Sequence, residues 1–242
     1  MESLVTSLVQ SMLIALIGLL APLVFGYGLL FAYRIRRYQR SRYYEQTKHP
    51  YMKVVNDLGL YGEYLCVAAI ESRFQRPLVL TNLYLPHPTK KDRTTEIDVV
   101  LIHQSGIHII ESKNFSGWIF GRETDRYWTQ TLPRRRKHQF FNPIKQNALH
   151  IKAVARALQL DASLLHSWIV FSNRATLKRI DATVPVVSRS EWMNRLLALS
   201  EAPLTLEQQH AYFEALVPFT RVSDAVRQQH IEAMNVTKSP LS

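Results

Sequence analysis

The stretch GIHIIESK, residues 106–113, ends in a carboxylate and an ammonium group suited to proton transfer or to work beside a metal ion. Glu111 and Lys113 are separated by one residue, so the alternation of a β-strand points both to the same face. Asp98 lies in the preceding apolar stretch EIDVVLIH, residues 96–103, where a charge is costly unless it is paired or binds a cation. Only two residues separate the stretches, which predicts an antiparallel hairpin with Asp98 and Glu111 at similar heights.

Two carboxylates that converge in this way repel each other. A proton, a cationic side chain or a hard divalent metal ion relieves the repulsion. Mg²⁺ favours one or two carboxylates together with waters and phosphate oxygens, and Lys113 would stand beside it, placed to orient an attacking water. The simpler alternative is an ion pair of Lys113 with Asp98 or Glu111 at a strand end, without any catalytic role.

Two further polar residues occur where helices are expected to pack over this hairpin. Glu63 is the lone acid in the first turns of an apolar helix predicted over residues 57–74. Gln146 lies one turn into a helix that Asn142 and Pro143 are expected to open. Each has an ordinary explanation, because acids near helix N-termini are common and an amide can simply be solvated. Gln146 could also hold a metal-bound water or a phosphate near the helix N-terminus, and the helix that carries Glu63 must pack over the sheet that carries Asp98.

The surrounding elements alternate between helical and strand patterns, which predicts an α/β fold with a mixed sheet flanked by helices. A capping box at Thr205 and Gln208 is expected to open a later helix. Besides the helix over residues 57–74, we expect strands at 78–85, 96–103, 106–113, 118–120 and 166–172, and a helix from about 142 to 158.

Five motifs occur in a fixed order along the chain: YGEYL, TEIDVVLI, GIHIIESKN, GWIFG and FNPIKQN. Together they resemble the nuclease-related domain, NERD, over roughly residues 54–172. This family is grouped with the PD-(D/E)xK nuclease superfamily. The resemblance implies a restriction-endonuclease-like core, a mixed central sheet flanked by helices, that hydrolyses phosphodiester bonds of DNA or RNA.

The resemblance also assigns roles to the residues of the site. It implies that Asp98, Glu111 and the backbone carbonyl of Ser112 bind Mg²⁺ or Mn²⁺. It implies that Lys113 is the catalytic lysine. The remaining implied members are Glu63, a helix-borne acid, and Gln146, an accessory polar residue. Ser112 stands where many members of the family have threonine, and the backbone contribution is unaffected by that change.

Residues 12–33, from Met12 to Tyr33, contain no charge and would span roughly 33 Å as a helix, enough to cross a bilayer core of ~30 Å. The arginines follow this stretch, so we expect the N-terminus outside and the rest in the cytoplasm, at a bacterial inner membrane. The cluster Arg34–Arg42 is expected to contact anionic lipid headgroups. A faint four-residue repeat of Gly18, Pro22 and Gly26 suggests helix-mediated self-association.

A second basic cluster contributes to the net charge of +11 and comprises Arg134, Arg135, Arg136 and Lys137. Its position just before FNPIKQN suggests nucleic-acid binding near the edge of the site, with salt-dependent phosphate contacts. Trp128, Phe140 and Phe141 are expected to offer stacking surfaces for unpaired bases. The alternative is a charged solvated loop.

Other chemistries lack support. The single Cys66 excludes an intramolecular disulfide and a cysteine-based zinc site. The nine histidines show no zinc-binding spacing, and neither a glycine-rich phosphate loop nor a G-x-S-x-G motif occurs.

The sequence thus predicts a membrane-anchored, metal-dependent nuclease. A nucleic-acid-binding module without turnover and a membrane-tethered protein-interaction domain stay open as alternatives. The expected parts are an extracytoplasmic N-terminus at 1–11, a transmembrane helix at 12–33, a basic linker at 34–52, the nuclease-like domain at 53–180 and a C-terminal strand and helical extension at 181–242.

Overall fold

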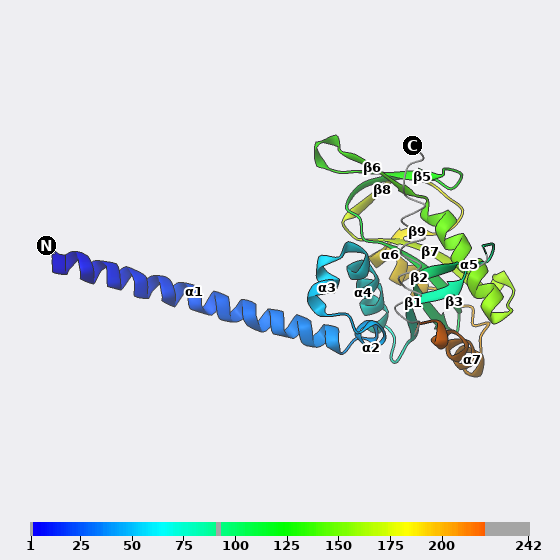
Figure 1. Ribbon diagram of the computed structural model, residues 1–242, viewed down its shortest axis with the longest axis horizontal. Helices are drawn as coiled ribbons and strands as arrows, with labels where there is room; N and C mark the ends of the chain where they lie inside the picture. The colour runs from blue at the N-terminus through cyan, green and yellow to red at the C-terminus, as the bar shows by residue number, and fades with distance from the viewer. Residues whose placement is uncertain (1, 91–92, 221–242) are drawn as a thin grey trace. The chain divides into compact units, whose positions relative to one another are not determined.

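The computed structural model describes residues 2–90 and 93–220, and it divides into two compact units, Met1–Ser41 and Arg42–Ser242. The first unit is the helix α1 (Glu2–Gln39), which contains Pro22 (Figure 1). Its stretch Val5–Gln39 is long and apolar enough to cross a membrane. The helix is longer than the predicted span of 12–33, because it continues through the first arginines of the basic cluster.

The second unit is built on a five-stranded mixed sheet in the order β1-β2-β3-β7-β9. The pairs β1–β2 and β2–β3 are antiparallel, whereas β3–β7 and β7–β9 are parallel. His103 pairs with Gly106 across the predicted two-residue turn, so the hairpin is confirmed. The strands are β1 (Leu78–Pro86), β2 (Thr94–His103), β3 (Gly106–Lys113), β7 (Leu165–Phe171) and β9 (Val186–Ser188).

Helices cover this sheet, with α4 and α5 both packed against β3. Asp57 caps α4, and its side chain accepts hydrogen bonds from the backbone N–H groups of Gly59 and Leu60. The predicted capping box at Thr205 and Gln208 is confirmed and opens α7. The helices of the second unit are α2 (Arg42–Thr47), α3 (Tyr51–Asn56), α4 (Leu58–Glu71), α5 (Pro143–Leu158), α6 (Arg189–Leu197) and α7 (Leu206–Leu216), with 3₁₀ turns η2 (Ala162–Leu164) and η3 (Val217–Thr220).

The part of the expected linker near residues 43–52 differs from the prediction. The sequence suggests a linker without regular structure there, as part of the basic linker at 34–52, whereas the structure forms α2 and the start of α3. Tyr43 and Val54 are fully buried, so both short helices pack as part of the domain. The residues 221–242 of the expected C-terminal extension lie outside the described part of the chain.

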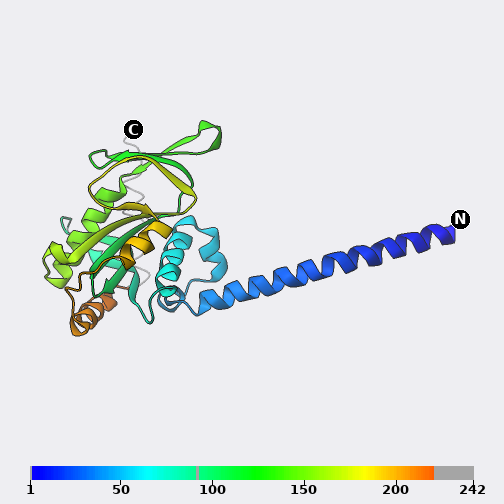
Figure 2. The same cartoon turned by 180° about the vertical axis from the view of Figure 1, so that it is seen from behind.

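A second, four-stranded sheet in the order β6-β5-β4-β8 was not foreseen from the sequence. Figures 1 and 2 both show it beside the end of the first sheet that carries β7 and β9. The segment read as a basic loop is largely strand, with the short turn η1 (Pro133–Arg135) between β5 and β6. The strands are β4 (Gly117–Arg122), β5 (Tyr127–Thr131), β6 (Lys137–Phe141) and β8 (Ala175–Asp181).

One face of the second sheet is buried in its own hydrophobic core. Ile119 and Trp128 are fully buried there with Phe171 of β7, and the rings of Trp128 and Phe171 stack at 6.3 Å. The expectation that Trp128 offers a stacking surface for bases is therefore wrong, because its indole is a core side chain. Phe140 packs against the same core and is half-buried, whereas Phe141 is exposed.

Candidate functional site

The β2–β3 hairpin places the predicted acids next to each other at one end of the pairing. Val99 pairs with Ile110, so the next residues, Asp98 on β2 and Glu111 on β3, lie opposite each other on the two strands. The backbone N–H of Ser112 donates a hydrogen bond of 2.8 Å to Asp98 Oδ2. Glu111 is completely buried and Asp98 is half-buried. The structure therefore brings the two carboxylates together at the end of β3.

Lys113 joins this group from the same face of β3. Its Nζ donates hydrogen bonds to Glu111 Oε1 at 2.5 Å and to Gln146 Oε1 at 3.3 Å. Burial by itself would lower the pKa of Lys113, but the neighbouring carboxylates of Glu111 and Asp98 outweigh burial and raise it. The Lys113 side chain is therefore a charged ammonium group at neutral pH, fixed by its two hydrogen bonds, and not a neutral amine that could accept a proton.

Helix α5 supplies two side chains to this face of β3. Gln146 and His150 are four residues apart, so they lie on one side of the helix. His150 Nδ1 is 3.4 Å from Glu111 Oε2, an ion pair when the imidazole is protonated. Sequence reasoning missed His150, because its four-residue spacing from Gln146 puts the two on one side of a helix but does not show what that side packs against.

Two buried asparagines explain why α5 holds Gln146 in this place. Asn142 caps the helix by accepting a hydrogen bond from the Ile144 N–H, and its Nδ2 reaches three backbone carbonyls of the β4–β5 connection. Asn147 Nδ2 donates to the carbonyl of Ile109 on β3 at 3.0 Å and to Ser167 Oγ on β7 at 2.9 Å. The FNPIKQN motif thus fixes the start of α5 against both sheets.

Helix α4 brings Glu63 to the site. The hydroxyl of Tyr43 donates a hydrogen bond of 3.0 Å to Glu63 Oε2. Burial, reinforced by the negative charge of Glu96, raises the pKa of Glu63 to about 8. Glu96, two residues before Asp98, accepts a hydrogen bond of 2.6 Å from the Tyr84 hydroxyl and was not singled out from the sequence.

The carboxylates at this end of the sheet influence each other. Burial, together with the charges of Glu111 and Glu63, raises the pKa of Asp98 well above its usual value. Lys113 and the Ser112 N–H oppose that rise. One lysine therefore faces three acids, and its single positive charge could not balance all three carboxylates if they were ionised.

A divalent metal ion would supply the missing positive charge. Among residues 2–90 and 93–220, no three or more His, Cys, Asp or Glu side chains are already arranged as a metal centre. The donor set nevertheless suits a hard cation, because it consists of carboxylate oxygens and lacks thiolates. The raised pKa values of Asp98 and Glu63 are consistent with this, since a bound cation would favour the ionised carboxylates that burial, and then the neighbouring acids, disfavour. The residues present therefore fit Mg²⁺ or Mn²⁺.

The second basic cluster lies on the other sheet, at the connection between β5 and β6. Arg134, Arg136 and Lys137 are exposed, and the side chain of Arg135 lies outside the described part of the structure. Asp98, Glu111 and Lys113, called the acid–lysine group below, lie in contrast at the end of β3 in the first sheet. The prediction that the cluster binds nucleic acid stays a prediction.

A serine and a histidine also meet at the opposite end of the β2–β3 hairpin. Ser105 Oγ is 3.0 Å from His108 Nε2, while Trp168 Nε1 donates to His108 Nδ1 at 3.0 Å. Burial lowers the pKa of His108 well below its usual value, so the ring is neutral with its proton on Nε2. That proton prevents Nε2 from accepting one from Ser105, which is itself buried. We interpret this contact as structural.

Comparison with known proteins adds three findings. Residues 58–172 match the family model of NERD, the nuclease-related domain. An uncharacterized protein of Bacillus anthracis is 37% identical over 93 residues, which are 38% of this chain and 43% of that relative. The match thus covers less than half of the relative's length. The crystal structure of a protein of unknown function, AF1548, aligns over 74% of this chain and 98% of that chain, with 14% identity and a TM-score of 0.27, a likeness too low to support an argument.

Proposed function

We propose a function from the premise that residues 58–172 of this chain form a nuclease-related domain, the family that the sequence motifs resemble. The protein is a metal-dependent nuclease that hydrolyses phosphodiester bonds of nucleic acid at a membrane. The observation that carries this proposal is the meeting of Asp98, Glu111 and Lys113 at the end of β3, inside the matched region.

Each residue of the site has a distinct part in the proposed reaction. Asp98, Glu111 and the backbone carbonyl of Ser112 hold the metal ion. When bound, Mg²⁺ or Mn²⁺ supplies a nucleophilic water near neutral pH and offsets the charge of the phosphate. Lys113, charged and held by Glu111 and Gln146, orients the water or a phosphate oxygen. Glu63 completes the acid set.

Helix α1 is the proposed anchor. Its apolar stretch is followed by arginines at positions 34, 36, 37, 40 and 42. The positive-inside rule then places the N-terminus outside and the domain in the cytoplasm, at an inner membrane, with the arginines near anionic headgroups. Any nucleic acid that the protein cleaves is met at that surface.

A second candidate is a nucleic-acid-binding module without turnover. The contact of 2.5 Å between Lys113 Nζ and Glu111 Oε1 supports it, because a structural ion pair at a strand end has the same geometry. Such a module would bind nucleic acid and leave every phosphodiester bond intact with any divalent metal.

Cleavage assays on the full chain in detergent separate the two candidates. Single-stranded DNA, duplex DNA and RNA are incubated with Mg²⁺, Mn²⁺ or a chelator, beside the Glu111→Gln variant. We expect metal-dependent cleavage by the wild type and a loss of at least ~100-fold in the variant, because a metal ligand contributes several kcal/mol to the transition state.

Glu207→Gln is the matched control, because Glu207 is exposed on α7 and far along the chain from the acids. It should cleave like the wild type. Equal rates for Glu111→Gln and wild type would rule out the proposed site.

A further inference from the structure

The outer face of the second sheet carries the most exposed aromatic side chains among the described residues outside α1. Trp118 on β4 is 52% exposed, Tyr127 on β5 is 47% exposed and Phe141 on β6 is 42% exposed. Their neighbours Ile119 and Trp128 are buried on the inner face, so strand alternation directs these rings outward. Exposed aromatic rings gathered on one sheet indicate a binding surface.

The strand register arranges the rings in a diagonal row. Tyr127 pairs with Phe141, and their rings meet edge to face at 6.3 Å. Phe120 pairs with Thr129 in the middle of the sheet, and Trp118 pairs with the last residue of β5. Four residues along a strand separate the two ends of the row, about 13 Å. That length fits a few nucleotides of an extended strand.

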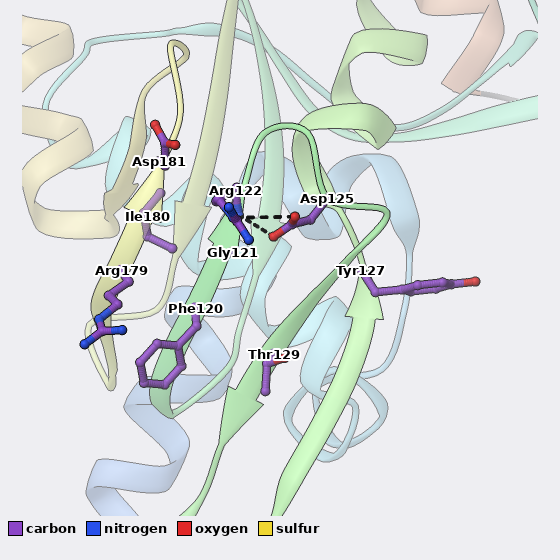
Figure 3. A pocket seen from close by; sticks show the side chains of 9 residues that line it. All are labelled: Phe120, Gly121, Arg122, Asp125, Tyr127, Thr129, Arg179, Ile180 and Asp181. Atoms are coloured by element: carbon purple, nitrogen blue, oxygen red, sulfur yellow. Dashed lines mark hydrogen bonds and ion pairs between the residues drawn. The ribbon is translucent and has the colours of Figure 1, made fainter.

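A cationic side chain lies beside each of three rings. Lys178 Nζ lies 5.3 Å from the centre of the Trp118 ring, and the Arg126 guanidinium lies 5.4 Å from the centre of the Tyr127 ring. Arg179 on β8 pairs with Phe120 on β4, and Figure 3 shows their side chains next to each other. Exposed cations set beside flat rings match a ligand that carries both phosphates and bases.

A pocket of about 470 Å³ opens on this sheet between β4, β5 and β8 (Figure 3). Phe120, Tyr127 and Arg179 are among its lining residues. Gly121 is part of the lining, and a side-chain carbon there would lie within 2.3 Å of the Trp128 indole. A glycine is therefore required for the buried tryptophan to pack under this part of the pocket.

We propose that the outer face of the second sheet binds single-stranded nucleic acid. Bases stack on Trp118, Phe120 and Tyr127, and the backbone phosphates contact Lys178 and Arg179. A duplex keeps the faces of its bases covered, so it cannot use the rings in this way. The inference deepens the proposed nuclease function by naming a substrate class.

The chain connects this face directly to the proposed active site. Strand β4 begins four residues after Lys113, and β6 leads through Asn142 into α5, which carries Gln146. A nucleic-acid strand bound on the second sheet would thus be bound by elements that flank the acid–lysine group in the chain.

Fluorescence anisotropy of the full chain in detergent tests the proposal, with a labelled single strand and a duplex of equal length. A chelator is present, so cleavage cannot affect the result. We expect the wild type to prefer the single strand and Trp118→Ala to bind it about tenfold more weakly, as for loss of one stacked base. Trp118→Phe, which keeps an aromatic face, should stay within about twofold of the wild type.

Two lysine variants test the phosphate contacts. Lys178→Ala should reduce the slope of log affinity against log salt by about 0.7, the value for one phosphate contact on a single strand. Lys152→Ala, an exposed lysine on α5, should leave it unchanged.

Wild-type affinity in both Trp118→Ala and Tyr127→Ala would overturn the inference and leave this face to a protein partner. Equal binding of duplex and single strand would overturn it too. If binding depends on Trp118 but no nucleic acid is cleaved with Mg²⁺ or Mn²⁺, the inference is upheld and the proposed nuclease activity is contradicted.

Discussion

At the scale of single residues, Lys113 holds the site together. Its ammonium joins Glu111 on its own strand to Gln146 on α5, and its pKa is raised by the surrounding acids. An ion pair and a catalytic lysine are therefore not exclusive readings of the GIHIIESK stretch. The same contact that neutralises Glu111 also fixes the direction of the ammonium.

The raised pKa of Glu63 predicts that stability depends on pH when divalent metal is absent. The folded chain keeps a proton up to about pH 8 that the unfolded chain releases near pH 4.5. This contribution is complete below pH 4.5 and is lost as the pH rises toward 8, by at most ~1.4 kcal/mol per pH unit. Glu63→Gln is neutral at every pH, so its free energy of unfolding should fall less between pH 5 and pH 8.

Urea unfolding of the full chain, followed by tryptophan fluorescence, measures this difference. Glu207→Gln serves as the control and should reproduce the slope of the wild type. A slope in Glu63→Gln equal to that of the wild type would show that Glu63 does not hold the proton.

The sequence was sufficient to predict that Asp98, Glu111 and Lys113 lie close together, because charges stand out in apolar strands. It was not sufficient to select His150 or Glu96. A histidine on an amphipathic helix and an acid at a strand end have ordinary explanations, and only the packing of α5 and α4 on the sheet reveals their neighbours.

At the scale of elements, the site depends on β3 lying between two helices. Gly62 of α4 approaches so closely that an added side-chain carbon would lie 2.8 Å from Asn114 Cβ and 3.0 Å from Ser112 Oγ. Glu111 and Lys113, the alternate residues, meet α5 instead. Each face of the strand end is thus held by a different helix.

We therefore expect Gly62→Ala to force α4 away from β3. The overpacking should cost about 1–3 kcal/mol of unfolding free energy and should also reduce activity, because Ser112 lies between the two charged residues. Chemical denaturation of the full chain measures the cost.

Gly59→Ala in the same helix is the comparison, because its added carbon meets only Asp57 Oδ1, at 3.3 Å. It should lie within about 1 kcal/mol of the wild type. Equal stability of the two variants would contradict the close packing of α4 on β3.

Elements with strong patterns were predictable, and those with mixed patterns were not. The apolar stretches of β2, β3 and β7 and the capped helices α5 and α7 follow from the sequence. Strand β6 was read as part of a basic loop, because Lys137–Phe141 begins next to three arginines and leaves most of its side chains exposed.

At the scale of the whole molecule, the chain combines an apolar helix with an α/β domain. The match of residues 58–172 to the NERD family model and the α/β class were predicted correctly from motifs and alternation. The second sheet was not, because its parallel pairing of β4 with β8 joins strands more than 50 residues apart in sequence, which local patterns cannot show.

The proposed anchor predicts how the protein fractionates. The full chain should stay in the membrane pellet through high salt and alkaline carbonate and should be released by detergent, because the apolar length of α1 suffices to cross a bilayer. A variant in which three leucines of this helix become arginines should lose that retention. Release of the wild type by carbonate would contradict a transmembrane anchor.

The central claim is that the acid–lysine group at the end of β3 cleaves phosphodiester bonds. Its most direct test is the cleavage rate of the full chain at saturating Mg²⁺, wild type beside Lys113→Ala, with Lys152→Ala as the control. We predict metal-dependent cleavage that Lys113→Ala abolishes and Lys152→Ala retains, with all three proteins folded. Cleavage by Lys113→Ala at the wild-type rate would contradict the account.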